Sequence, residues 1–144
     1  MFSLTHRQYG FSLLEVLVAL LVLSVGLMGL ASLQTLGLRQ GHAGYLRSQA
    51  TVLAGDIAER LRANREGALA GNYDIAAGAE PPDGKGITAV DLAHWKALLA
   101  AALPSGDGEV RCESATSSCQ VTVRWLDSRG GGDGKQSLAL RTLL

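Results

Sequence analysis

A run of uncharged, mostly apolar residues near the N-terminus constrains the fold of this chain more than any other feature. Residues 16–38 contain no charged side chain, and Glu15 stands directly before them. As an α-helix, the run would be roughly 35 Å long, which is enough to cross a hydrocarbon core of about 30 Å. The sequence therefore predicts a membrane-spanning helix that begins with a single carboxylate.

Two ordinary targeting segments compete as explanations of this run. A secretory signal peptide usually has an apolar core of about 7–15 residues. The run here is longer, although residues 29–31, Gly-Leu-Ala, offer a small-residue cleavage site. An uncut signal anchor fits the length, but its basic flank is only Arg7 with His6. Neither alternative explains why Glu15 stands at the start of the run.

Cleavage between Gly10 and Phe11 would explain the carboxylate. Phe11 would then carry a new α-amino group, and Glu15 lies four residues further on, about one helical turn away. In a bundle of such helices, the carboxylate of one subunit can meet the amine of the next, which pairs two charges that are costly in apolar surroundings. Glu15 would also lie in the first helical turn, where the macrodipole favours negative charge.

Residues 10–15, Gly-Phe-Ser-Leu-Leu-Glu, followed by the apolar run, resemble the class III signal of type IV prepilins and type II pseudopilins. The resemblance implies that a prepilin peptidase removes a leader, residues 1–10, by cutting between Gly10 and Phe11, and that it methylates Phe11. It also implies that Glu15 is the assembly contact. Residues 11–38 would be the transmembrane and assembly helix, and residues 39–144 a periplasmic head.

Residues 13–34 and 91–110 carry a narrower likeness, to the PilV-like minor pilins, also called type IV pilus modification proteins. That likeness implies a structural subunit of type IV pilus assembly, held in the inner membrane by a single helix and later part of the pilus at the cell surface. The implied partners are the prepilin peptidase, other minor and major pilins, the inner-membrane assembly platform and membrane lipid. Major pilins often have a proline in the first helix, and this run has none.

Beyond the apolar run, periodicity predicts a second helical part at residues 42–66 and a separate helix at 88–103. The first has one apolar stripe, formed by Leu46, Ala50, Leu53, Ile57 and Leu61. Glycines 37, 41 and 44 make a bend before it possible. In the second helix we expect Thr88 to be the N-cap and Asp91 its partner. Its expected buried side is Val90, Ala93, Ala97, Leu98 and Ala101, with Trp95 near one edge.

The C-terminal third changes to a period of two, which indicates strands. Strands are expected near 109–113, 119–126 and 136–143, with a long turn over 127–136. The simplest arrangement is an antiparallel meander that covers the amphipathic helix. The predicted fold class is therefore α+β and pilin-like, with a long N-terminal helix packed on a small antiparallel sheet.

The chain has two cysteines, Cys112 and Cys119, at a spacing that suits a bridge across the mouth of a hairpin. Such a disulfide would stabilise the head by about 2.5 kcal/mol and needs an oxidising compartment. Two free thiols or a metal-binding pair are the alternatives, although no histidine is near in sequence.

The remaining sequence favours a structural protein over an enzyme. No nucleophile, zinc or phosphate-loop motif is present, so we expect no catalytic residue, cofactor or metal site. Asp107, Asp127 and Asp133 are too dispersed to indicate calcium, and His94 is expected at the surface. With 13 basic and 13 acidic side chains, the chain offers no basic face for nucleic acid. A type II secretion pseudopilin and a membrane-anchored periplasmic binding module remain as alternative functions.

Overall fold

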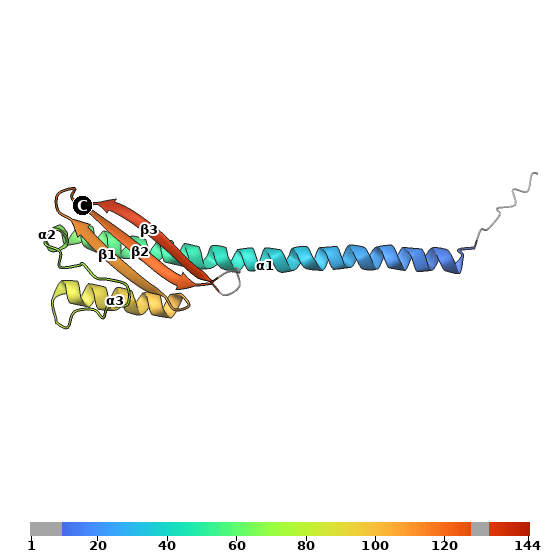
Figure 1. The fold of residues 1–144 in the computed structure, drawn as a ribbon, viewed down its shortest axis with the longest axis horizontal. Coiled ribbons are helices and arrows are strands. Elements are labelled where there is room, and N and C mark those ends of the chain that lie inside the picture. The colour runs from blue at the N-terminus through green and yellow to red at the C-terminus, as the bar shows by residue number, and fades with distance from the viewer. Residues whose placement is uncertain (1–9, 128–132) are drawn as a thin grey trace, which may run out of the picture. The chain divides into compact units, whose positions relative to one another are not determined.

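The computed structural model describes residues 10–127 and 133–144 of the 144-residue chain. The elements follow the order α1 (Leu13–Ala63), α2 (Arg65–Leu69), α3 (Ile87–Ala102), β1 (Asp107–Glu113), β2 (Ser118–Leu126) and β3 (Lys135–Leu143) (Figure 1). Two compact units divide the chain at Leu38 and Arg39. A long N-terminal helix and a small three-stranded antiparallel sheet confirm the predicted α+β, pilin-like fold class.

Helix α1 is a single element of 51 residues. Gly37, Gly41 and Gly44 lie inside it, and the helix continues through all three positions without a break. The helix predicted at 42–66 is the second part of α1 and ends earlier, at Ala63. Asn64 separates it from α2, because the Asn64 side chain accepts a hydrogen bond from the backbone N–H of Gly67 and so starts a new helix.

The sheet is an antiparallel meander in the order β1-β2-β3 (Figure 1). Val110 of β1 lies opposite Val121 of β2, which in turn lies opposite Leu140 of β3. Alternate side chains of β2 face the core, and Val121, Val123 and Trp125 are buried as their period-two pattern predicts. Half of the predicted turn over 127–136, residues 128–132, lies outside the described residues. Lys135 and Gln136, expected in this turn, belong to β3 instead.

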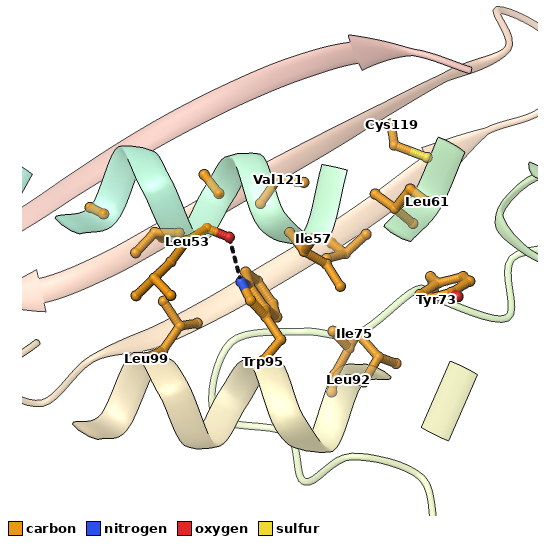
Figure 2. Close-up of a cluster of buried hydrophobic side chains, with 14 of the residues drawn as sticks. Leu53, Ile57, Leu61, Tyr73, Ile75, Leu92, Trp95, Leu99, Cys119 and Val121 are labelled. Atoms are coloured by element: carbon orange, nitrogen blue, oxygen red, sulfur yellow. Dashed lines mark hydrogen bonds between the residues drawn. The ribbon is translucent and has the colours of Figure 1, made fainter. Parts of the chain in front are cut away.

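The core of the Arg39–Leu144 unit lies between α1, α3 and the sheet. The predicted stripe of α1 is confirmed, since all five of its residues are buried. Trp95 lies at the centre rather than at an edge: its side chain is 0% exposed, and its indole Nε1 donates to the Leu53 carbonyl at 2.9 Å (Figure 2). The prediction for Trp95 was wrong because the tryptophan joins α3 to α1.

Helix α3 differs from its prediction in both its cap and its buried side. It begins at Ile87 after Gly86, and no side chain caps it, so Thr88 is not the N-cap. The buried residues are Ala89, Leu92, Trp95 and Leu99, whereas Val90 is 54% exposed and the alanines expected inside face solvent. The packing of Trp95 and Leu99 fixes the rotation of a helix whose alanines lie on both its buried and its exposed sides.

Cys112 and Cys119 form a disulfide, which the sequence predicted and which excludes the free-thiol and metal-pair alternatives. The two residues are directly opposite each other in the β1–β2 pair. The backbone N–H of Cys112 also donates to the Asp74 carboxylate at 2.8 Å. The bridge therefore closes the hairpin at the point where the loop before α3 meets β1.

Candidate functional site

The start of α1 carries the residues that the sequence singled out. Gly10 and Phe11 precede the helix, which begins at Leu13. The Ser12 hydroxyl accepts a hydrogen bond from the backbone N–H of Glu15 at 3.2 Å, and the Ser12 carbonyl accepts from the same N–H at 3.1 Å. Ser12 is therefore the N-cap of α1, a position that serine favours because its side chain satisfies an otherwise unpaired donor.

The sequence analysis missed Ser12, although its signal was present. Residues 12–15, Ser-Leu-Leu-Glu, have the spacing of a capping box, in which a serine and a glutamate three residues later define the first turn. Glu15 lies in that first turn, as predicted. Among the described residues, Glu15 has no ion-pair partner within the chain. Its carboxylate is thus available to a group that comes from outside the subunit.

The Gly10–Phe11 peptide bond lies outside the helix and is accessible. Both residues are exposed, with Phe11 at 82%, and no atom lies within 4 Å of a Cβ built on Gly10. A peptidase binds its substrate as open backbone rather than as a hydrogen-bonded helix. Because Ser12 stops α1 from extending backwards, the geometry keeps this bond free for cleavage.

The first part of α1 has a fully exposed apolar surface. Every residue from Leu13 to Leu38 is exposed, including Leu14, Leu21 and Met28 at 66–74%. By length and composition alone, α1 is suited to cross a membrane, with a mean hydropathy of 2.6 in its most apolar window. Within the described chain nothing covers this surface. It therefore requires lipid or other apolar helices around it.

The hydroxyl groups in this segment are satisfied within the helix. Ser24, Ser32 and Thr35 donate to the carbonyls four residues before them, at 2.7, 3.0 and 3.0 Å. Hydroxyls bonded in this way do not need water, so they are compatible with an apolar environment. Gln34 is the other uncharged hydrogen-bonding side chain of the run, close to its end.

The arginines near the end of α1 have structural partners. Arg60 donates to Asp56 at 3.0 Å and to Asp91 at 2.9 Å, and its contact with His94 Nδ1 is 3.1 Å. The hydrogen bond to Asp91 outweighs burial and raises the pKa of Arg60. Burial, together with a hydrogen bond to the same carboxylate, raises the pKa of Tyr73. Asp91, expected to be a helix cap, instead joins α1, α3 and the loop between them.

Metal ligands do not gather in the part of the chain that the structure describes. Within residues 10–127 and 133–144, no group of three or more His, Cys, Asp or Glu side chains could hold a metal ion. His94 is exposed, as predicted, and its partner is Arg60. Asp107 binds Lys96 and the Gly78 backbone N–H, so it secures the loop before α3.

Residues 5–31 match the family described as the prokaryotic N-terminal methylation motif. This is the class III prepilin signal. The match supports a type IV pilin-like protein. The signal includes Gly10, Phe11 and Glu15, together with the capped start of α1 and most of its exposed apolar surface. No curated protein and no solved structure gives a significant match to the chain.

The prepilin signal also bears on processing and location. It supports cleavage by a prepilin peptidase and assembly with other pilins. Together with the apolar surface of α1, it supports a membrane-anchored protein with a pilus or surface location. The matched residues before Gly10 lie outside the described residues.

Proposed function

We propose that this chain is a minor pilin, a structural subunit that takes part in type IV pilus assembly and has no enzymatic activity. The observation that carries the proposal is the prepilin signal on a capped, exposed apolar helix whose first turn holds a single carboxylate, Glu15. The likeness of residues 91–110 to PilV-like minor pilins supports this finer assignment over a pseudopilin, because the N-terminal part is shared by all pilin-like proteins.

Processing begins at the accessible bond between Gly10 and Phe11. The prepilin peptidase cuts this bond and methylates the amine of Phe11. The new amine then lies one residue before the Ser12 cap, at the same end of the helix as Glu15. The cut therefore adds a cation next to the anion that the sequence already provides.

Assembly follows from the charges at this end of α1. In the inner membrane, apolar side chains around the helix face lipid. In the growing fibre, they face the helices of other minor and major pilins, and the Glu15 carboxylate of one subunit meets the Phe11 amine of another. Leaving either charge unpaired in apolar surroundings is strongly unfavourable, so this pairing selects the assembled arrangement.

The head, residues 39–144, is proposed to lie in the periplasm before assembly. The Cys112–Cys119 disulfide supports this orientation, because disulfides persist in oxidising compartments. The short basic flank of the leader would remain in the cytoplasm until cleavage. The assembly platform of the inner membrane would then move the subunit into the fibre.

Intact mass with N-terminal fragmentation of the membrane-extracted protein tests the processing step. We expect a chain that starts at Phe11, is heavier by one methyl group and is lighter by two hydrogens because of the disulfide. A chain that still starts at Met1 would refute the pilin mechanism and leave a simple anchor. A chain that starts at Ser32 would identify a secretory signal peptide instead.

Glu15→Ala tests the assembly step, and Glu80→Ala, at an exposed loop position of the head, is its matched control. We expect Glu15→Ala to be cleaved and methylated normally but absent from sheared pili, while Glu80→Ala is incorporated. Normal incorporation of Glu15→Ala would contradict the charge-pairing mechanism. Pili of normal abundance and composition in a strain lacking the chain, with a loss of protein secretion, would identify a type II pseudopilin.

A further inference from the structure

The two edge strands of the sheet in the Arg39–Leu144 unit differ in whether another segment of the chain bonds to their outer side. At the β1 edge, Ile75 pairs with Val110 through backbone hydrogen bonds of 3.0 and 2.9 Å. Asp74 adds its side-chain bond to Cys112 on the same edge. The opposite edge is β3, the last strand in the order β1-β2-β3 (Figure 1). Among the described residues, no further strand pairs with it.

The ladder shows which backbone groups of β3 face this free edge. The N–H of Leu144 bonds to the Ser117 carbonyl at 2.9 Å, and the Gly134 carbonyl accepts from Asp127 at 2.6 Å, so both residues direct their backbone groups toward the β2 side. In an antiparallel ladder, every second residue of a strand bonds through its backbone N–H and C=O to the same adjacent strand, and the residues between them direct these groups to the other side. Even-numbered residues of β3 therefore bond to β2, and odd-numbered residues present their N–H and C=O groups outward.

The outward groups at the centre of the strand belong to Ser137, Ala139 and Arg141, all of which are exposed. Within the described residues, no hydrogen bond reaches these backbone groups from the outer side. Near the end of the strand, the Arg62 guanidinium donates a hydrogen bond to the outward Leu143 carbonyl at 3.4 Å. The centre of β3 thus presents a row of unpaired donors and acceptors.

This edge has only part of the protection that edge strands usually carry. Edge strands are commonly protected by charged side chains, above all lysine, by proline, by bulges or by a covering segment, and β3 has two charged residues, Lys135 and Arg141. β3 contains no proline and pairs with β2 through an uninterrupted register from Lys135 to Leu143. Its inward positions, Leu138 and Leu140, pack against the core, and its charged residues alternate with them on the outer side.

The side chains around the edge define the chemistry of a partner. Leu138 and Leu140 are only half-buried, so apolar residues on an added strand would complete their cover. On the outer face, Arg111, Gln120 and Arg141 form one cross-strand row. The Arg141 side chain is 64% exposed, and its carboxylate partner, Glu113, is 3.8 Å away. A carboxylate on an added strand would lie opposite Arg141.

We propose that the free edge of β3 binds an extended segment of another protein chain by β-strand addition. Backbone hydrogen bonds to Ser137, Ala139 and Arg141 supply the affinity, and alternate side chains supply the specificity. The segment has apolar residues at the positions beside Leu138 and Leu140, and it has an acidic residue opposite Arg141.

Charge argues against a second copy of β3 as the occupant. Both charged residues of β3, Lys135 and Arg141, are basic. Two copies of β3 that paired antiparallel about Leu138 would place Lys135 of one strand opposite Arg141 of the other, and like charges directly opposite each other are destabilising. The segment is therefore an acidic stretch of a different protein.

The test uses the full chain, labelled with ¹⁵N in detergent micelles, and the capped peptide Thr-Val-Thr-Val-Glu-Val-Thr-Val-Thr as the probe, which places valines beside Leu138 and Leu140 in either strand direction. We expect the amide signals of Ser137, Ala139 and Arg141 to shift saturably and their hydrogen exchange to slow. A peptide with Lys in place of Glu is expected to bind about fivefold more weakly, since cross-strand charge pairs contribute up to about 1 kcal/mol. Arg141→Glu should reverse this preference.

Ala139→Pro removes one outward N–H without removing a bond of the β2–β3 ladder, a position at which edge strands tolerate proline. We expect it to abolish peptide binding, while Ala139→Ser, which retains the N–H, binds normally. Equal binding by a folded Ala139→Pro chain, or shifts confined to residues outside β3, would overturn the proposal. Should Ala139→Pro fail to fold, the charge reversal at Arg141 decides: an unchanged preference refutes the edge site.

Discussion

Gly108 of β1 lies where the core has no room for a side chain. A Cβ at this position would be 2.3 Å from Cη2 of Trp95 and 2.7 Å from Cδ1 of Leu99. Carbon atoms normally approach to about 3.5–4.0 Å, so Gly108→Ala overlaps the indole by about 1 Å. The ring cannot move away freely, because its Nε1 is bonded to the Leu53 carbonyl.

Overpacking a core by one methyl group costs about 1–3 kcal/mol. We take about 2 kcal/mol for Gly108→Ala, which corresponds to a fall of roughly 10 °C in Tm for a head of this size. Urea unfolding of the full chain in micelles, followed by tryptophan fluorescence, measures the change. The matched control is Gly55→Ala, because no atom lies within 4 Å of its Cβ and alanine is the better helix former.

A double variant locates the clash. Trp95→Phe removes the outer ring atoms that the new methyl group meets, so Gly108→Ala should cost at least about 1 kcal/mol less in that background. Additive effects of the two substitutions would show that the methyl group does not meet the indole. Wild-type stability of Gly108→Ala alone would refute the close approach of β1 to α3.

Three further predictions concern the disulfide, the partly buried ion pair of Lys96 and Asp107, and the helix cap. Reducing Cys112–Cys119 should lower the free energy of unfolding by about 2.5 kcal/mol in urea titrations, and a midpoint insensitive to reductant would contradict this. Burial alone would raise the pKa of Asp107. The hydrogen bonds from Lys96 and from backbone N–H groups together lower this pKa by more, so the net shift is downward. The ionised carboxylate therefore stabilises the fold above its ordinary pKa of 3.8, and this stability is lost as pH falls through the lower folded value. In Asp107→Asn, the Tm should depend less on pH on the acid side of the pH profile. An unchanged slope would show that other groups cause this dependence. Ser12→Ala should destabilise the first turn of α1 by about 1 kcal/mol, which amide exchange at its start detects; exchange as slow as in the wild type would exclude the cap.

Sequence patterns correctly predicted the elements in which apolar residues lie on one face and polar residues on the other. The α1 stripe stands out because charged residues such as Asp56 and Glu59 occupy its other sides. In β2, buried side chains alternate with more exposed ones from Cys119 to Trp125. Helix α3 shows less of this contrast, since six of its 16 residues are alanine and they lie on several sides of the helix. Its rotation was therefore set by Trp95, whose contact with Leu53 joins residues 42 positions apart in the chain.

At the candidate site, residue types alone singled out Glu15 and Phe11 but did not predict the local backbone. Glu15 stands out because it precedes a long uncharged run, and Phe11 because of its spacing from Glu15. Ser12 was visible in a capping-box pattern but was overlooked beside the stronger signal. Asp91 could not have been assigned, because its partners Arg60 and Tyr73 meet it only once α1 and α3 are packed together.

The internal hydrogen bonds of Ser24 and Ser32 have a consequence for motion along a fibre. Between Val16 and Leu33, every hydroxyl is already bonded within α1, so neighbouring helices would meet through contacts without preferred direction. Between such surfaces, no hydrogen bond from these hydroxyls has to break when one helix moves past another. The stagger between subunits would then be set almost entirely at one point, Glu15. Under the proposed function, a subunit would move along its neighbours until its Glu15 carboxylate pairs with the Phe11 amine of another subunit, and this ion pair would fix its position.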